Sequence, residues 1–225
     1  MILDAGLRSR AELRSGAVSL AARSLACRRG RRLLFRGLGL RLEGGSITWL
    51  RGANGSGKTS LMRILAGLSM PAEGAVTWNG QCLQQAGPAS AGIVYIGHAN
   101  ALKDDLTLTE AVAFMARLHG IGAAAPRARD ALDRLGLASR RDALVRTLSQ
   151  GQRRRGALAR LTLDAEPRVW ILDEPFDALD HDSVTLLSGL IDAHAARGGT
   201  VLLTSHQPVP LHNAHDFDLE PWRTA

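Results

Sequence analysis

A glycine-rich run at positions 52–59, GANGSGKT, constrains the fold of this chain more than any other sequence feature. It fits the pattern GxxxxGK[ST], follows a strand-like apolar segment at 46–51, and opens a segment at 58–68 with apolar residues at helical spacing. Glycines let a backbone wrap closely around phosphate oxygens, and a helix N-terminus faces their negative charge. The run therefore predicts a nucleotide phosphate site between a strand and a helix of an α/β fold.

Every residue of this run, and the serine after it, is a candidate contact to the nucleotide. We expect Lys58 to reach the β- and γ-phosphates of ATP, and Thr59 to ligate Mg²⁺. The candidate phosphate contacts are Gly52, Ala53, Asn54, Gly55, Ser56, Gly57, Lys58, Thr59 and Ser60.

A second run, VWILDE at 169–174, is an apolar strand that ends in two carboxylates. In a parallel sheet this end lies at the same edge as the phosphate loop. We expect Asp173 to hold the Mg²⁺ shell and Glu174 to activate the attacking water, a general-base role typically worth about 10²–10⁴ in rate. The alternative is that both acids only cap the following helix.

The order of patterns along the chain predicts one α/β domain with a helical insertion. Short apolar segments at 18–51, 75–78 and 93–96 are typical of strands, helical signals dominate 107–164, and strands at 169–173 and 200–205 flank a crossover helix at 182–197. The sequence predicts a mostly parallel sheet core, an antiparallel β edge and an inserted helical subdomain. Predicted bounds are 1–17 for an N-terminal extension, 18–225 for the nucleotide-binding domain, and about 98–165 for the helical subdomain.

Composition excludes several other classes of protein. The chain has 225 residues, 45% of them hydrophobic, but no apolar run approaches the about 18 residues of a membrane-spanning helix. The N-terminus does not resemble a secretory signal, so we expect a cytoplasmic location. The formal net charge is +7, yet Lys58 and Lys103 are the only lysines, which indicates a bias towards arginine. We expect no nucleic-acid partner, and a basic edge would be compatible with nearby lipid headgroups.

A third run, LSQGQ at 148–152, decides the family. It resembles the LSGGQ signature of the ABC ATPases, and it stands at the start of a predicted helix just ahead of Asp173. ALD at 178–180 resembles the D-loop of this family, and His206 stands where the family has its switch histidine. The resemblance extends from about 18 to 208 and implies the P-loop NTPase fold of ABC type.

The resemblance implies a homodimer in which two chains sandwich each ATP. Ser149, Gly151 and Gln152 would contact the γ-phosphate of a nucleotide held by the other copy. His206 would contact the same phosphate as a catalytic residue of the chain that binds it, and Asp180 would couple the two sites.

Three positions depart from the family pattern. Gln150 replaces a glycine, which requires an ordinary φ at that position. His98 stands where these ATPases usually carry the Q-loop glutamine, so it becomes a candidate residue for sensing Mg²⁺, water and a membrane partner. Arg29 stands where an aromatic residue commonly stacks on adenine, and its guanidinium can stack in the same way.

Within the family, the chain is similar to the haem-exporter ATPases of cytochrome c maturation. The similarity rests on five runs, which are RG at 29–30, LF at 34–35, TSLMRILAGL at 59–68, YIGH at 95–98 and GQRRR at 151–155. It implies an enzyme that hydrolyses ATP for haem export or delivery in c-type cytochrome biogenesis. Its partners would be integral membrane permease subunits, and it would lie at the cytoplasmic face of the bacterial inner membrane. Two alternatives are the ATPase of a drug or lipid exporter and a soluble ABC-type ATPase that acts on ribosomes or DNA.

Overall fold

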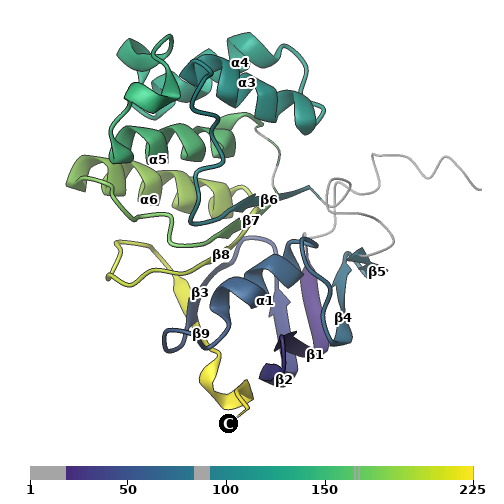
Figure 1. Ribbon diagram of the computed structural model, residues 1–225. Coiled ribbons are helices and arrows are strands. Elements are labelled where there is room, and N and C mark those ends of the chain that lie inside the picture. Colours follow the sequence, from purple (N-terminus) through teal and green to yellow (C-terminus); the bar gives the residue numbers. More distant parts are fainter. Residues whose placement is uncertain (1–18, 84–91, 165, 167, 225) are drawn as a thin grey trace, which may run out of the picture.

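A computed structural model describes residues 19–83, 92–164, 166 and 168–224 of the chain. The strands form two sheets, and most of the helices lie to one side of the larger sheet, as Figure 1 shows. The predicted extension at 1–17 lies outside the described residues.

The larger sheet is parallel throughout, in the order β6-β7-β8-β3-β9. Its strands are β6 (Ile93–Ile96), β7 (Val169–Leu172), β8 (Thr200–Leu203), β3 (Ile47–Arg51) and β9 (Ala214–Asp218). Alternate residues of β7 enter different cores: Val169 and Ile171 pack on one side of the sheet, and Trp170 and Leu172 on the other. A strand buried on both faces reads as a continuous apolar run, which explains the VWIL sequence.

The smaller sheet is antiparallel, in the order β2-β1-β4-β5. Its strands are β2 (Arg32–Leu42), β1 (Leu20–Arg29), β4 (Glu73–Trp78) and β5 (Gln81–Cys82). Helix α1 (Lys58–Leu65) packs between the two sheets, where Leu61, Met62, Ile64 and Leu65 are buried in a core that both sheets share. The prediction of a parallel core with antiparallel strands is confirmed, and the antiparallel strands form a sheet of their own.

The helical block follows β6 and contains α3 (Leu108–Leu118), α4 (Ala124–Arg134) and α5 (Gln150–Leu158), with 3₁₀ turns η2 (Ala138–Arg140), η3 (Val145–Thr147) and η4 (Ala159–Thr162). Thr107 caps α3 through a capping box with Glu110. Small buried residues such as Ala116 and Ala128 let α3 and α4 approach closely. The block shares one continuous core with the parallel sheet, and the subdomain bounds at 98–165 stay a prediction.

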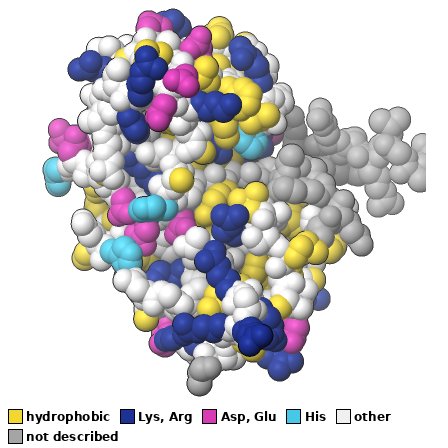
Figure 2. Space-filling view, in the orientation of Figure 1, with side chains coloured by type: hydrophobic (Ala, Val, Ile, Leu, Met, Phe, Trp, Pro, Cys, Tyr) yellow, Lys and Arg dark blue, Asp and Glu magenta, His cyan; other side chains and the backbone are white. Residues whose placement is uncertain are grey.

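The crossover helix α6 (His181–Ala196) joins β7 to β8 on the same side as this block, and the chain closes with η5 (Glu220–Trp222) after β9. In the described part of the chain, no helix has both the length and the apolar character of a membrane span. On the face shown in Figure 2, Lys and Arg side chains lie over the helical block as well as over the lower end of the molecule, with acidic side chains among them.

Candidate active site

A groove of about 400 Å³ gathers most of the residues singled out in the sequence. It lies between the start of α1 and the segments that follow β6, β7 and β8. Its lining residues are Arg29, Leu34, Asn54, Gly55, Gly57, Lys58, Thr59, Ser60, His98, Asp173, Glu174 and His206. Parallel topology produces this convergence, because the carboxyl ends of the strands meet at one edge.

The phosphate loop has the backbone that its glycines predict. Gly57 has a φ of +107°, and a Cβ at this position would lie 3.2 Å from the ring of Phe35. Gly57 is the N-cap of α1 and leaves the helix N-terminus without a side-chain cap. Lys58 Nζ donates to the carbonyl oxygens of Gly52 (2.7 Å) and Ala53 (3.2 Å), which keeps the ammonium within the loop. Backbone N–H groups and a cation thus face the groove together.

The remaining predicted loop residues divide into two groups. Asn54, Gly55, Thr59 and Ser60 line the groove, whereas Gly52 and Ala53 contribute through the carbonyl oxygens that hold Lys58. Ser56 is buried. A side chain at Gly52 would collide with Ser56 Oγ, since an added Cβ would lie 2.9 Å from it. These three residues shape the loop instead of lining the space.

The two acids at the end of β7 have different surroundings. Asp173 is only 4% exposed, and its Oδ1 accepts a hydrogen bond from Thr204 Oγ1 at 3.0 Å. Tyr95 also hydrogen-bonds with Asp173, and burial, together with the charge of Asp173, raises the pKa of Tyr95 to about 12. The tyrosine hydroxyl therefore stays protonated and can orient the carboxylate.

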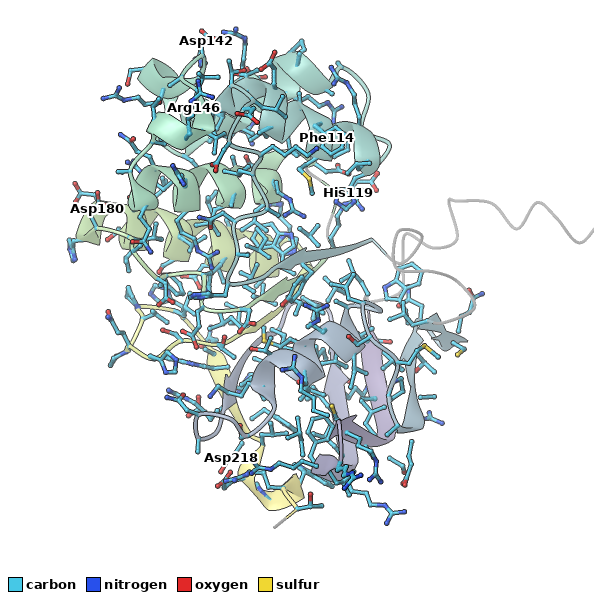
Figure 3. The ribbon with its side chains drawn as sticks, viewed as in Figure 1. Phe114, His119, Asp142, Arg146, Asp180 and Asp218 are labelled. Carbon is cyan, nitrogen blue, oxygen red and sulfur yellow. The ribbon has the colours of Figure 1, made fainter. Side chains whose placement is uncertain are left out.

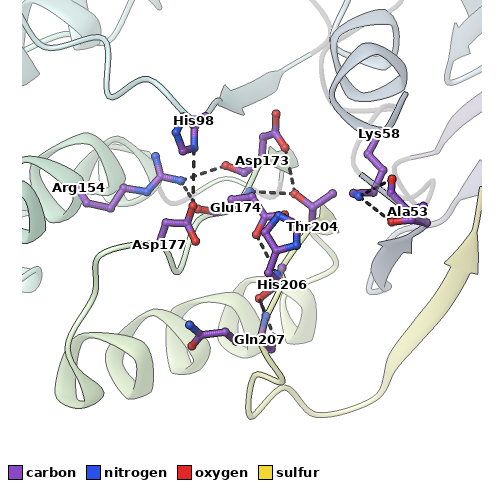
Figure 4. Close-up of polar contacts among 12 residues, drawn as sticks. Ala53, Lys58, His98, Arg154, Asp173, Glu174, Asp177, Thr204, His206 and Gln207 are labelled. Atoms are coloured by element: carbon purple, nitrogen blue, oxygen red, sulfur yellow. Dashed lines mark hydrogen bonds and ion pairs between the residues drawn. The ribbon is translucent and has the colours of Figure 1, made fainter. Parts of the chain in front are cut away.

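Glu174 is fixed by contacts of both its backbone and its side chain. Its backbone has a φ of +50°, a left-handed conformation that is uncommon for a residue with a side chain. Its N–H donates to Thr204 Oγ1 (2.9 Å), and its carboxylate Oε2 accepts from the backbone N–H of His206 (3.0 Å). The His206 Nε2 lies 3.5 Å from Glu174 Oε1. The geometry brings the predicted base and the predicted switch histidine into direct contact, as Figure 4 shows.

The predicted metal ligands fit a magnesium ion. Thr59 and Asp173 both line the groove and offer a hydroxyl and a carboxylate oxygen, the hard donors that Mg²⁺ prefers. No group of three His, Cys, Asp or Glu side chains suited to a metal occurs in the described ranges. The Thr59 hydroxyl and the Asp173 carboxylate suit an ion that takes most of its ligands from phosphates and water rather than from the protein.

The two substituted positions, His98 and Arg29, also line the groove. The side chain of His98 is 81% exposed, and its Nδ1 lies 3.7 Å from Asp177 Oδ2. Arg29 is the last residue of β1. Both side chains can reach a ligand in the groove.

The LSQGQ segment does not line this groove. Ser149 is the N-cap of α5 and forms a capping box with Gln152: Ser149 Oγ accepts from the Gln152 N–H at 3.2 Å, and Gln152 Oε1 accepts from the Ser149 N–H at 3.1 Å. The Ser149 hydroxyl still has a proton to donate. Gln150 begins α5 without a positive φ, as this substitution requires. A side chain at Gly151 would collide with the carbonyl oxygen of Ala178 at 2.8 Å.

Asp180 is the N-cap of α6, where its Oδ1 accepts from the Ser183 N–H at 2.9 Å. Figure 3 shows Asp180 at the outer end of α6, below the helical block that carries Arg146. Hydrogen bonds from Ser183 lower the pKa of Asp180 and keep it ionised.

Three residues that matter for this geometry were not singled out as site residues in the sequence. Thr204 joins Asp173 to Glu174, Tyr95 contacts Asp173, and Arg154 of α5 donates to the carbonyl oxygens of both acids. Thr204 could have been found, since it follows the apolar strand at 200–203 at the sheet edge where the acids lie. Arg154 stands among other arginines with nothing to distinguish it.

Comparison with known proteins agrees with this geometry. The family model of the ABC transporter matches residues 35–177, more than half of the chain. The chain belongs to the ABC transporter family. The predicted phosphate loop at 52–59, the run at 148–152 and the two acids at 173–174 lie within the matched residues, whereas His206 lies beyond them.

Curated members of the ABC transporter family resemble the chain over most of its length. The cytochrome c biogenesis ATP-binding export protein CcmA of Dechloromonas aromatica is 47% identical over 191 residues, which cover 84% of this chain and 93% of that protein. CcmA of Haemophilus influenzae is 42% identical over 205 residues, which cover 91% and 96%. Within the ABC transporter family, the chain therefore belongs with the cytochrome c biogenesis ATP-binding export proteins.

A solved structure confirms the fold. The ATP-binding cassette MJ0796, described as a dimer in a post-hydrolysis state bound to ADP and Pi, has a TM-score of 0.75 and 22% identity, and the match covers 84% of this chain and 88% of that one. The names of the relatives favour the cytochrome c pathway over the drug or lipid exporter and over the ATPase for ribosomes or DNA.

Proposed function

We propose that this chain is the ATP-hydrolysing subunit of a membrane export complex that supports haem delivery in c-type cytochrome biogenesis, and that it works as a homodimer. One observation carries the proposal: the phosphate loop, both acids and His206 share one groove, whereas the Ser149 turn does not line it. A site that needs both the groove and a Ser149 turn would be completed by the Ser149 turn of a second copy. The dimer described for MJ0796 and the names of the curated relatives support this reading.

ATP would bind with its β- and γ-phosphates against the N–H groups of the loop and the Lys58 ammonium. Charge-assisted hydrogen bonds of this kind are about twice as strong as neutral ones. Arg29 would stack on the adenine at the outer end of the groove. Mg²⁺ held by Thr59 and Asp173 would neutralise phosphate charge and orient the leaving group.

Glu174 would act as the general base. Its carboxylate takes a proton from a water molecule whose oxygen attacks the γ-phosphorus, and the bond from that phosphorus to the ADP oxygen breaks, which leaves ADP and inorganic phosphate. His206 would hold the γ-phosphate through its ring Nε2, while its backbone N–H donates to the Glu174 carboxylate and fixes it. Positioning of this kind costs no reorganisation during the reaction.

The second copy would supply Ser149, Gly151 and Gln152 to the same γ-phosphate. ATP would then stabilise the closed dimer, and loss of phosphate would reopen it. Moving such an equilibrium from 1:99 to 99:1 requires about 5.5 kcal/mol of differential affinity. The helical block and the exposed His98 would transmit closure to membrane permease subunits, so that the chain lies peripherally at the cytoplasmic face of the inner membrane.

Glu174→Gln tests the proposal in the full-length chain. The amide keeps the size and the hydrogen bond from His206 but cannot accept the proton of water. We expect ATP binding to persist, hydrolysis to fall by about 10²–10⁴, and a stable dimer to appear in size-exclusion chromatography with light scattering when Mg²⁺ and ATP are added.

The matched control is Glu43→Gln, because Glu43 pairs with Arg41 on the exposed surface. It should hydrolyse ATP at the wild-type rate and remain monomeric at the same concentration. Hydrolysis at the wild-type rate by Glu174→Gln would exclude Glu174 as the base. An ATP-loaded mutant that stays monomeric would contradict the two-chain site.

A further inference from the structure

Arg154 lies at the junction of three segments that meet beneath the groove. It is only 3% exposed, and it comes from the second turn of α5, the helix that begins at the Ser149 turn. Its guanidinium donates to Glu174 O (2.6 Å), Asp173 O (3.1 Å), Gly97 O (2.9 Å), Asn100 Oδ1 (3.2 Å) and Pro175 O (3.2 Å). Figure 4 shows it on the far side of Asp173 and Glu174 from Lys58.

These partners belong to separate functional segments. Gly97 and Asn100 flank His98 in the loop after β6, and Glu174 is the proposed base. A planar guanidinium has five donors spread over three nitrogens and can make all five contacts, whereas an ammonium has three donors on one nitrogen. The side chain therefore connects the Ser149 helix, the His98 loop and Glu174 within one chain.

A cation at this depth is not needed to fill space. Apolar side chains of similar volume often fill such sites with no loss of stability. Burial lowers the pKa of Arg154, and the charges of Asp177, Asp173 and Glu174 oppose that effect. Within the described residues, no carboxylate oxygen lies within 4.0 Å of its guanidinium, so its direct partners are neutral oxygens. The carbonyl contacts, rather than an ion pair, define its geometry.

The contact with Glu174 bears on an uncommon backbone conformation. The left-handed backbone of Glu174 is sterically disfavoured relative to the ordinary helical region, because Glu174 carries a Cβ. Thr204 holds its N–H and Arg154 holds its C=O, so both peptide groups of this residue are fixed. Loss of either hydrogen bond would let the Glu174 backbone relax and would move the carboxylate away from the attacking water.

We propose that Arg154 is a positioning residue that fixes Glu174 in its left-handed conformation and links it to the His98 loop and to the Ser149 helix. This role rests on the proposed function. It predicts that engagement of the Ser149 turn by a nucleotide and the placement of Glu174 depend on each other through one side chain. Arg154 does not line the groove, so the effect of its loss should fall on turnover and not on nucleotide affinity.

The test measures ATP affinity and steady-state hydrolysis of full-length Arg154→Gln and Arg154→Lys. For both variants we expect kcat to fall by about 10- to 100-fold, as the loss of hydrogen bonds to a charged donor predicts, with KM for ATP changed less than threefold. Lysine keeps the charge but should not rescue turnover, because its three donors on one nitrogen cannot replace the five contacts of the guanidinium.

Arg160→Gln is the matched control. Arg160 follows α5, is largely buried and donates to the carbonyl oxygen of Tyr95 at 3.4 Å, but it does not contact either acid. It should lower the melting temperature without the selective loss of kcat. A folded Arg154→Lys with wild-type kcat would overturn the proposal, and so would an Arg154→Gln whose loss lies in KM alone.

A double mutant separates this proposal from the proposed function. If Arg154 acts through Glu174, adding Arg154→Gln to Glu174→Gln should cause no further loss of hydrolysis. An additional loss of the full single-mutant size would show an independent action and would overturn the positioning role. Absence of ATP hydrolysis by the wild-type chain would overturn the proposed function itself, and this role with it.

Discussion

Two helix N-termini in this chain are proposed to contact the same phosphate, and they are built differently. Helix α1 has Gly57 as its N-cap and no side-chain cap, so its first N–H groups face the groove unsatisfied by the protein. Helix α5 has a complete capping box between Ser149 and Gln152. Neither helix has an acidic residue in its first turn.

The difference in capping indicates which of the two helix N-termini depends on the nucleotide for its cap. At α1 the phosphate itself provides the missing cap, which favours tight binding by one chain. At α5 the helix is already capped, so the turn is ordered before any nucleotide arrives and offers only what remains, a hydroxyl proton and the positive end of the helix dipole. On the proposed two-chain mechanism, we therefore expect binding first at α1 and closure on α5 second.

A third helix N-terminus is capped in a related way. Helix α3 also has a capping box, but its partner to Thr107 is Glu110, and hydrogen bonds from Thr107 lower the pKa of Glu110. The box of α5 uses neutral Gln152 in the same position. A neutral partner keeps the capping hydrogen bonds without placing a negative charge where a phosphate is expected to dock.

Among the changes that test the two helix N-termini, Lys58→Ala is expected to have the largest effect. It removes the cation at the uncapped α1 terminus, and the dissociation constant for ATP should rise about 10- to 100-fold, as the loss of a charge-assisted hydrogen bond predicts. Titration with a fluorescent ATP analogue measures it. Lys103→Ala is the control, because Lys103 is the other lysine of the chain and is exposed. Unchanged affinity in Lys58→Ala would refute the phosphate-loop assignment.

Gln152→Glu should have a smaller and more selective effect. Glutamate keeps or improves the capping box, so the melting temperature should not fall. Its charge would repel the γ-phosphate of the partner's nucleotide, and ATP-dependent dimerisation should weaken about tenfold, with affinity for ATP in the monomer unchanged. Analytical ultracentrifugation measures the dimer.

The reverse exchange, Glu110→Gln in α3, is the control for Gln152→Glu and should leave dimerisation unaffected. If both exchanges weakened the dimer equally, or if neither did, the capped α5 terminus would not be a phosphate contact.

The smallest effect on the isolated chain is expected from His98→Ala. His98 lines the groove but is largely exposed, so its loss should reduce cytochrome c maturation in cells more than basal ATP hydrolysis in solution. His212→Ala is the control, since His212 is also exposed and pairs with Asp192 at 2.7 Å. Normal maturation with His98→Ala would exclude it from coupling.

Much of this site could be predicted from the sequence because its determinants are local. The phosphate loop needs glycines at fixed spacing, and a strand buried on both faces reads as a continuous apolar run that ends at its acids. The capping box of α5 follows the S-x-x-Q spacing and could have been found as well.

Other features depend on tertiary structure and left no signal of this kind. Strand β9 has the sequence AHDFD and pairs only with β3 at an edge of the sheet, so it carries no apolar run. Arg154 reads like its neighbours Arg153 and Arg155, and it is buried through tertiary contacts with the segments that follow β6 and β7. The separation of the antiparallel strands into their own sheet likewise depends on α1 filling the space between the two sheets.

At Glu174 the left-handed backbone places thermal stability and turnover in conflict. A glycine would adopt the same φ without steric cost, so the most relaxed version of this turn has no carboxylate. If Glu174 is the general base, as proposed, selection of variants for heat resistance alone would therefore enrich for inactive sequences at this position.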